Sequence, residues 1–234
     1  YNDDEDFWYY ADGSGNLYAG EFKTIKGKKY AFRNDGRMID GLKFIYEDKD
    51  AQSLTVWADD DDPYRFDSED DFDDNAPLYE AAGYYCYYFG NGDDGAMRTN
   101  KNTVEIDGDK YNFYFEKSGG NKGAGLTGEK DDKYYQSGKL IKAGSDDKYQ
   151  VVKVNTYGKN SDLDETLAAG TDITAYDKLD DVDAFLKDLG DNNIEYYTKA
   201  DLEGMSDADA KKILNAANIN KKLADLKEVY IPKT

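Results

Sequence analysis

A pattern of aromatic residues followed by glycines returns roughly every twenty residues through the first two-thirds of the chain, and it constrains the fold more than any other feature. The first copy reads WYYADGSG from Trp8 and ends near Gly20, and the second reads YAF from Tyr30 and continues to Gly36 and Gly41. Looser copies follow at residues 87–95, 113–125 and 134–144. Units of this size cannot bury an apolar face alone and must pack on their neighbours. The sequence therefore predicts a repeat protein with many similar shallow sites, which suit binding better than catalysis.

The composition excludes several classes of function. The chain has 234 residues with a formal net charge of −20, which repels phosphate backbones and anionic lipid, so we expect no nucleic-acid partner and no membrane insertion. It has no histidine and a single cysteine, Cys86, which excludes Ser-His-Asp and Cys-His catalytic sites, His- or Cys-rich metal sites and an intrachain disulfide. Cys86 lies among tyrosines in a predicted strand. We expect it to be a small buried core residue, with a reactive thiol as the alternative.

The N-terminal 160 residues divide into two predicted hairpin blocks separated by an acidic run. Residues 1–58 contain the first two copies, a tight turn at Asp35-Gly36 and a predicted strand at 54–57. Residues 59–77 are strongly acidic, and like-charge repulsion with few apolar residues predicts a solvated linker or loop. The alternative there is Ca²⁺ binding, because hard cations prefer carboxylate oxygens. Residues 78–160 resume the hairpins with insertions.

Within this second block, residues 104–111 read as a strand, an Asp-Gly turn and a second strand, and residues 148–154 as a further strand followed by a turn at 155–159. From residue 161 to 234 the apolar period changes from two to about 3.6, which predicts a helical C-terminal cap or module. A capping box at 161–164 predicts one helix start. A second helix is predicted from the apolar stripe Val182, Phe185, Leu186 and Leu189, with Gly190 as its C-cap. A further helix is predicted after Ser206, and a last one from the stripe Leu223, Leu226 and Tyr230.

Residues 7–46 resemble the cell-wall-binding repeats of bacterial surface proteins, and residues 84–144 resemble them more loosely. This superfamily includes choline-binding repeats, the glucan-binding repeats of glucosyltransferases and the C-terminal repeats of large clostridial toxins. The resemblance rests on the spacing of Trp8, Tyr10, Gly20, Tyr30 and Gly36. It implies a mainly β fold in which hairpins stack as a β-solenoid, joined here to the small helical C-terminal region. It also implies a secreted protein of the bacterial cell wall or cell surface, whose signal peptide is removed or lies outside this sequence.

The resemblance also assigns ligand-binding candidates. In choline-binding members, aromatic residues of successive hairpins form a cage for the quaternary ammonium group. The corresponding candidates here are Trp8, Tyr10, Tyr18, Tyr30, Phe32, Tyr88, Tyr114 and Tyr135. The alternative is that these aromatic residues form the core, because little else in the chain is apolar enough to offset the entropy of folding. Choline-type units carry a Gly-Trp pair, whereas Glu21 and Leu42 follow the glycines here, which favours a glycan, or no small ligand, over choline.

The predicted function is therefore that of a non-catalytic module, in which several weak aromatic sites hold a cell-wall polymer or glycan by multivalency. No cofactor or metal is expected. Carboxylates suitable for glycoside hydrolysis are abundant, but a repeat fold offers no deep pocket to perturb their pKa, so we do not expect an enzyme. The alternative is a structural spacer or a protein-interaction scaffold without carbohydrate affinity. Exposed coplanar aromatic rings favour the binding module, and rings that all point inward favour the spacer.

Overall fold

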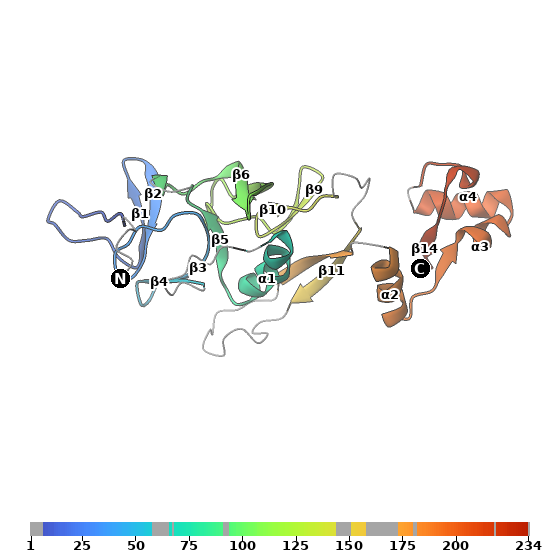
Figure 1. Ribbon diagram of the computed structural model, residues 1–234, viewed down its shortest axis with the longest axis horizontal. Helices are drawn as coiled ribbons and strands as arrows, with labels where there is room; N and C mark the ends of the chain where they lie inside the picture. The colour runs from blue at the N-terminus through green and yellow to red at the C-terminus, as the bar shows by residue number, and fades with distance from the viewer. Residues whose placement is uncertain are drawn as a thin grey trace. The chain divides into compact units, whose positions relative to one another are not determined.

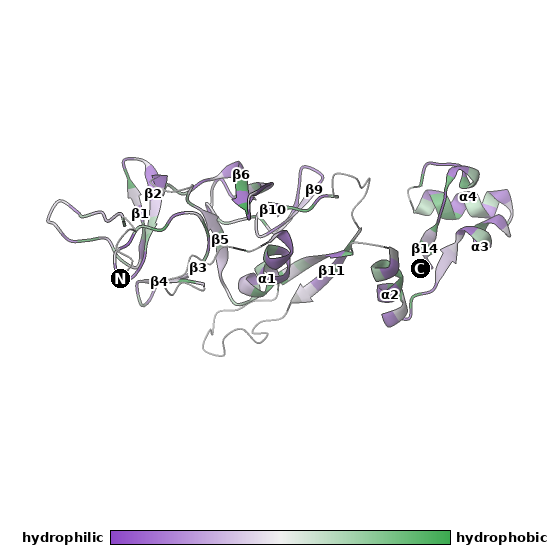
Figure 2. Cartoon of the chain, in the orientation of Figure 1, coloured by the Kyte–Doolittle hydropathy of each residue, from purple (hydrophilic) through white to green (hydrophobic). Residues whose placement is uncertain are grey.

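A computed structural model describes residues 7–57, 66, 68–90, 94–143, 151–157, 173–179, 182–217 and 219–233 (Figure 1). The chain forms two compact units, an N-terminal unit (Tyr1–Asp177) and a C-terminal unit (Lys178–Thr234). Hydrophilic and hydrophobic residues alternate at short intervals along the elements of both units (Figure 2). Among the described residues, no helix is both long enough and apolar enough to cross a membrane.

The N-terminal unit starts with short hairpins. An isolated bridge between Ala11 and Leu17 closes the first, and β1 (Glu21–Ile25) pairs with β2 (Lys28–Phe32) in the second. The turn between β1 and β2 has positive φ at both Lys26 and Gly27, as the tightest two-residue hairpin turn requires. The predicted Asp35-Gly36 turn is confirmed, since the Gly36 N–H donates to the Arg33 carbonyl at 2.9 Å and Gly36 has a φ of 89°.

Two further antiparallel sheets and one strand pair complete this unit. The three-stranded sheet has the order β4 (Ser53–Val56), β3 (Leu42–Asp48) and β5 (Tyr85–Tyr88). The five-stranded sheet has the order β6 (Asn100–Ile106), β7 (Asp109–Phe115), β10 (Lys139–Leu140), β9 (Lys133–Gln136) and β8 (Gly128–Lys130). Strands β11 (Val151–Tyr157) and β12 (Ile173–Leu179) pair with each other, and the boundary between the two units falls within β12, after Asp177. The hairpin predicted at 104–111 is confirmed as β6, an Asp107-Gly108 turn and β7, and residues 155–157 belong to β11 instead of a turn.

The acidic run differs from the expected linker. Residues 59–65 lie outside the described part of the chain, but residues 69–77 belong to α1 (Glu69–Ala81). The Ser68 hydroxyl caps this helix by accepting a hydrogen bond from the Asp71 N–H at 3.0 Å. The carboxylates of the first turn, including Glu69 and Asp71, are stabilised by the positive end of the helix dipole. The charges that suggested a repulsive loop therefore favour a helix N-terminus.

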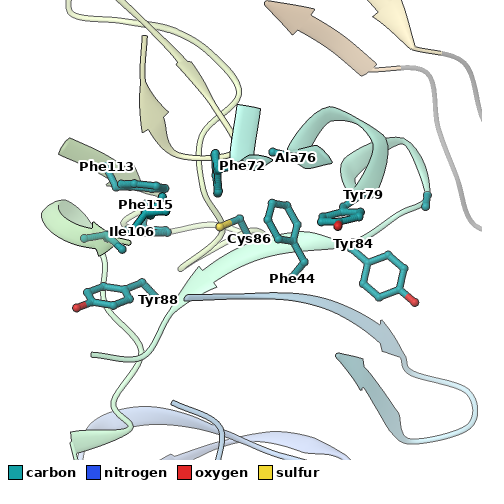
Figure 3. Packing of buried hydrophobic residues seen from close by; sticks show 12 residues of the cluster. Phe44, Phe72, Ala76, Tyr79, Tyr84, Cys86, Tyr88, Ile106, Phe113 and Phe115 are labelled. Atoms are coloured by element: carbon teal, nitrogen blue, oxygen red, sulfur yellow. The ribbon is translucent and has the colours of Figure 1, made fainter. Parts of the chain in front are cut away.

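The core of the N-terminal unit is aromatic, and α1 lies over it. Phe72 of α1 packs against Phe44 of β3 and Phe113 of β7, with ring centroids 6.0 Å and 5.4 Å apart. Figure 3 shows Phe72 and Ala76 of the helix above the side chains of Phe44 and Cys86. Cys86 is buried in β5, as predicted for a core residue. Burial of each large side chain contributes roughly 1.5–3 kcal/mol to the free energy of unfolding.

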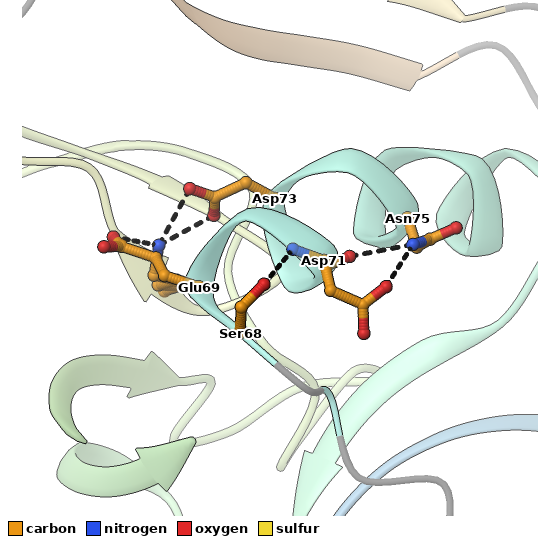
Figure 4. A network of polar contacts seen from close by, with 6 residues as sticks. Ser68, Glu69, Asp71, Asp73 and Asn75 are labelled. Atoms are coloured by element: carbon orange, nitrogen blue, oxygen red, sulfur yellow. Dashed lines mark hydrogen bonds and ion pairs between the residues drawn. The ribbon is translucent and has the colours of Figure 1, made fainter. Parts of the chain in front are cut away.

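One buried cation fixes the position of α1 on the five-stranded sheet. The amine of Lys139, in β10, lies 2.5 Å from Glu69 Oε1 and 2.8 and 2.9 Å from the two carboxylate oxygens of Asp73. It also lies 5.1 Å from the centroid of the Tyr111 ring. Figure 4 shows the two carboxylates converging from the N-terminal half of the helix, beside the Ser68 cap. The helix is thus held by charge as well as by apolar packing.

The predicted β-solenoid is wrong. In the described residues the strands form several separate small antiparallel sheets, with α1 packed among them, so the fold is a mixture of α and β structure. A solenoid needs each unit to repeat the pairing of the last, but β3 pairs with β5 across the inserted helix, and β10 pairs with β7. Phe72 and Tyr79 of α1 pack on Phe44, so the helix covers the sheet surface that a stacked hairpin would need.

The C-terminal unit is a small α and β structure of its own. Its elements are α2 (Val182–Asp191), β13 (Tyr196–Thr198), α3 (Lys199–Glu203), α4 (Asp207–Ala216), the 3₁₀ helix η2 (Leu223–Asp225) and β14 (Tyr230–Pro232). Strands β13 and β14 pair antiparallel. The core consists of Leu202, Ala210, Leu214, Val229 and Ile231.

Several helix predictions for this unit are confirmed. The α2 stripe is helical, and the Ser206 hydroxyl caps α4 by accepting from the Asp209 N–H at 3.2 Å. The helix predicted through Leu223, Leu226 and Tyr230 is wrong, because Tyr230 pairs with Thr198 in a strand. Gly190 lies inside α2 instead of at its C-cap. The capping box expected at 161–164 lies outside the described residues.

Candidate ligand-binding site

Four of the eight predicted aromatic residues meet at one cavity of about 390 Å³ in the N-terminal unit. They come from successive copies of the sequence pattern: Trp8 and Tyr10 from the first, Tyr30 and Phe32 from the second. The remaining lining residues are Tyr9, Ile25, Lys26, Lys28, Met38 and Asp94. A small concave site with aromatic walls and a few polar groups is typical of ligand-binding sites.

Backbone hydrogen bonds place the aromatic residues of the first hairpin against the second. The Met38 N–H donates to the Trp8 carbonyl at 2.8 Å, and the Tyr18 N–H donates to the Tyr10 carbonyl at 3.0 Å. The Asp12 carboxylate closes the loop between them by accepting from the backbone of Asn16 and Ser14. These donors, Asn16 first, lower the pKa of Asp12 below its ordinary value, so the carboxylate stays ionised near neutral pH.

The aromatic residues of the cavity differ in exposure. Phe32 is only 1% exposed and belongs to the interior, whereas Trp8 is 55% and Tyr10 40% exposed. The Tyr10 ring stacks on Tyr18 with a centroid distance of 6.0 Å and an interplanar angle of 9°. The Tyr18 ring also has the Lys23 amine 4.5 Å from its centroid. Tyr9, which also lines the cavity, is 48% exposed, so the exposed ring surface at this site belongs mainly to Trp8, Tyr9 and Tyr10.

The polar groups of the cavity carry a surplus of positive charge. The amines of Lys26 and Lys28 lie on or beside the β1–β2 turn, and the single lining carboxylate is that of Asp94. Asp94 is ion-paired with Lys28 at 3.6 Å and with the guanidinium of Arg98. The ion pair with Lys28 compensates both charges, and Arg98 adds a second cation to Asp94, so the charge around the cavity stays positive and Asp94 offers little attraction to a further cation. The lysine amines can still donate hydrogen bonds to hydroxyl or anionic groups.

The segment that carries Asp94 is fixed against the second hairpin. The Met97 N–H donates to the Lys29 carbonyl at 2.7 Å. A Cβ at Gly95 would overlap the side chain of Met38, so glycine allows the backbone to approach that residue closely. Asp94 thus reaches a cavity whose other lining residues come from positions 8–38.

The remaining four candidates do not line this cavity. Tyr18 is half-buried, and Tyr88, Tyr114 and Tyr135 are buried in the protein. Tyr88 stacks on Phe115 at 6.1 Å, and Tyr114 lies 6.0 Å from Tyr135. These last three therefore fit the core alternative, and they present no open ring face to a ligand.

Sequence reasoning did not identify several lining residues of the cavity. Lys26 and Lys28 could have been found, because they flank a glycine between two alternating segments, the signature of a hairpin turn. Asp94 could not, since nothing in its local sequence connects it to Lys28. For the Ca²⁺ alternative, the described part of the chain contains no group of three acidic, cysteine or histidine side chains able to hold a metal ion.

No protein family matches the sequence of this chain, and no curated protein does. Similar solved structures include choline binding protein F from Streptococcus pneumoniae, with a TM-score of 0.36 and 18% identity over 62% of this chain and 35% of that chain. A crystal structure of choline binding protein F in complex with ipratropium gives a TM-score of 0.36 and 18% identity over 62% of this chain and 34% of that chain. This chain thus matches about a third of the length of those chains, and a likeness of this size does not assign it a ligand.

Proposed function

We propose that this chain is a non-catalytic binding module of the bacterial cell surface, which holds a cell-wall polymer or glycan at the cavity lined by Trp8, Tyr10, Tyr30 and Phe32, called the Trp8 cavity below. The observation that carries the proposal is the meeting of Trp8 and Tyr10 with Tyr30 and Phe32 at one concave site. Exposed aromatic rings pack against the apolar faces of sugar rings, and neighbouring amines donate hydrogen bonds to hydroxyl groups.

The charge of the cavity favours a neutral or anionic polymer over a simple quaternary ammonium ion. A choline group would gain attraction from the faces of Trp8 and Tyr10, but it would also meet the amines of Lys26 and Lys28. The Asp94 carboxylate is already paired with Lys28 and Arg98. Phosphate or hydroxyl groups of a wall polymer would instead find donors there, so choline is the less favoured ligand.

A spacer or protein-interaction scaffold is the second candidate, and a specific observation favours it. Phe32, Tyr88, Tyr114 and Tyr135 are all buried, so half of the aromatic candidates serve packing. The described residues then contain one clustered aromatic site instead of a regular series. Multivalent attachment within a single chain would not operate in that case.

The test is retention of the purified chain on insoluble cell walls and on a glycan array, with and without choline and calcium. We expect saturable retention that Trp8→Ala weakens roughly tenfold, because an aromatic contact contributes about 0.5–1.5 kcal/mol beyond its buried area. Tyr134→Ala is the matched control, since Tyr134 is an exposed aromatic residue on β9 that does not line the cavity.

The outcomes separate the candidates. Retention on particular sugars that Trp8→Ala weakens to this extent supports a glycan module, and release by free choline would assign a quaternary ammonium ligand instead. If wild-type protein is not retained under any condition, the binding proposal fails and the scaffold remains. Equal losses for Trp8→Ala and Tyr134→Ala would also contradict a specific role for the cavity.

A further inference from the structure

The C-terminal unit contains a cavity of about 720 Å³, a volume within the range of small-molecule binding sites. It lies between α3, α4 and the segment at 219–224 that leads into η2. Nothing in the sequence pattern of the first two-thirds of the chain bears on it. It is therefore independent of the Trp8 cavity and of the function proposed there.

The floor of this cavity is the open side of the unit's own core. Leu202 and Leu214 are buried core residues, and both line the cavity. Met205, Ile219 and Leu223 pack against the same core and also line the cavity, partly exposed. An apolar group placed here would remove already assembled apolar surface from water, which is the main favourable term in binding of this kind.

The rim carries three lysines, Lys211, Lys221 and Lys222. All three are exposed, and within the described residues none has a carboxylate within ion-pair distance. Of the two acidic lining residues, Glu203 is the last residue of α3 and already lies 3.8 Å from the amine of Lys199, and Asp207 is the first residue of α4. In a chain with a net charge of −20, a group of three uncompensated amines around an apolar floor is a local exception.

We infer that this cavity binds an amphipathic anion, a molecule with an alkyl or similar apolar body and a single carboxylate or phosphate head. The apolar body occupies the floor formed by Leu202, Leu214 and their neighbours. The head lies at the Lys211, Lys221 and Lys222 side of the rim, where amines attract the charge and donate hydrogen bonds. Charge complementarity excludes an amphipathic cation of the same length as the preferred ligand.

The test is a titration of the full chain with decanoate below its micelle concentration, followed by amide chemical shifts in ¹H–¹⁵N spectra. We expect saturable shifts concentrated in residues 202–224. Decyltrimethylammonium should bind at least tenfold more weakly, and decyl maltoside, which has the same chain and no charge, should lie between them. Decyl phosphate tests the second head group, and saturable binding of either anion supports the inference.

Variants then test the lysines. Lys221→Gln combined with Lys222→Gln should weaken decanoate binding by roughly four- to twenty-five-fold, since each exposed ion pair accounts for about a two- to fivefold change. Lys212→Gln is the matched control, because Lys212 is an exposed neighbour on α4 that does not line the cavity. The inference is overturned if neither anion binds, if the cation binds as tightly as decanoate, or if Lys212→Gln weakens binding as much as the double variant.

Discussion

The amine of Lys139 lies 2.8 Å from Oδ1 of Asp73, and this contact joins the five-stranded sheet to the N-terminal half of α1. The two partners are not equally buried: the side chain of Lys139 is 2% exposed, whereas those of Asp73 and Glu69 are 22% and 34% exposed. Solvent can therefore stabilise the carboxylates without the amine, but it cannot stabilise the amine without the carboxylates. The contact is asymmetric in its consequences for stability.

This asymmetry predicts different costs for removing the two sides of the contact. Glu69→Gln combined with Asp73→Asn removes both of these carboxylate charges from the buried amine and should lower the free energy of unfolding by about 3–5 kcal/mol. Lys139→Met removes the cation and leaves two carboxylates that reach water, so it should cost less, about 1–3 kcal/mol. Urea unfolding followed by tryptophan fluorescence measures both, because Trp8 and Trp57 are the only tryptophans of the chain and both lie in the N-terminal unit.

Lys23→Met is the control for charge removal, since its pair with Glu21 at 3.6 Å is largely exposed and should contribute at most about 1 kcal/mol. A Lys139→Met variant less stable than the double carboxylate variant would contradict the asymmetry.

Glu80 should make the free energy of unfolding depend on pH in the opposite direction to most acidic residues. Burial raises its pKa above the ordinary value of 4.5, although Thr127 and Gln136 donate hydrogen bonds to the carboxylate. Between the ordinary and the raised value the folded state binds the proton more strongly than the unfolded state. The Glu80 contribution to stability is therefore fully present below 4.5 and is lost as the pH rises through the folded-state pKa.

Glu80→Gln removes this titration. The difference in free energy of unfolding between wild type and variant should thus shift in favour of the variant as the pH rises from 4.5, as measured by urea unfolding at a series of pH values. Working with the difference cancels the exposed carboxylates of the chain, including Asp12, whose pKa is lowered and whose effect has the opposite sign. A pH-independent difference would show that Glu80 titrates normally.

Gly125 lies where the backbone near Ser137 approaches closely, so a larger residue should not fit at this position. Its N–H donates to the Cys86 carbonyl at 2.7 Å, and a Cβ at this position would overlap the backbone carbonyl of Ser137. Because backbone atoms cannot move aside as a flexible side chain can, Gly125→Ala should destabilise the N-terminal unit by about 1–3 kcal/mol or more. Gly120→Ala is the matched control, since open space surrounds that position and its φ is not positive. Thermal unfolding should show a lower midpoint for Gly125→Ala alone.

Local signals in the sequence predicted the elements whose partners are close in the chain. The Asp107-Gly108 hairpin and the Ser206 cap are of this kind, because a turn or a cap depends on a few adjacent residues. The same signals were present for α1, with Ser68 as the cap and Phe72, Ala76 and Tyr79 on one face. The acidic charge of this segment outweighed them in the prediction, although acids favour a helix N-terminus.

Contacts between distant residues could not be predicted from the sequence. Lys139 contacts Asp73 and Glu69, which lie 66 and 70 positions away in the sequence. Asp94 pairs with Lys28 at the Trp8 cavity. The repeat pattern drew attention to Trp8, Tyr10, Tyr30 and Phe32, and these four residues line one cavity. It did not show how the hairpins pair, because a spacing of aromatic and glycine residues does not specify sheet order. The solenoid prediction failed because it required a sheet order that this spacing does not specify.

Trp8 and Phe32 line the same cavity, but substitution of Phe32 should mainly lower stability, whereas substitution of Trp8 should mainly weaken binding. Phe32 is almost fully buried and packs 5.9 Å from Tyr18, so Phe32→Ala should lower the free energy of unfolding by about 3–5 kcal/mol. Trp8 is more than half exposed, so Trp8→Ala should change stability by no more than about 1 kcal/mol while it abolishes most retention on the cell-wall polymer. Urea unfolding followed by the fluorescence of Trp57, which both variants keep, measures the free energy of unfolding. Retention on cell walls measures binding. Trp8 would be a structural residue, and the cavity a packing feature of the hairpins, if Trp8→Ala destabilised the protein as much as Phe32→Ala and retention fell only in proportion to unfolding.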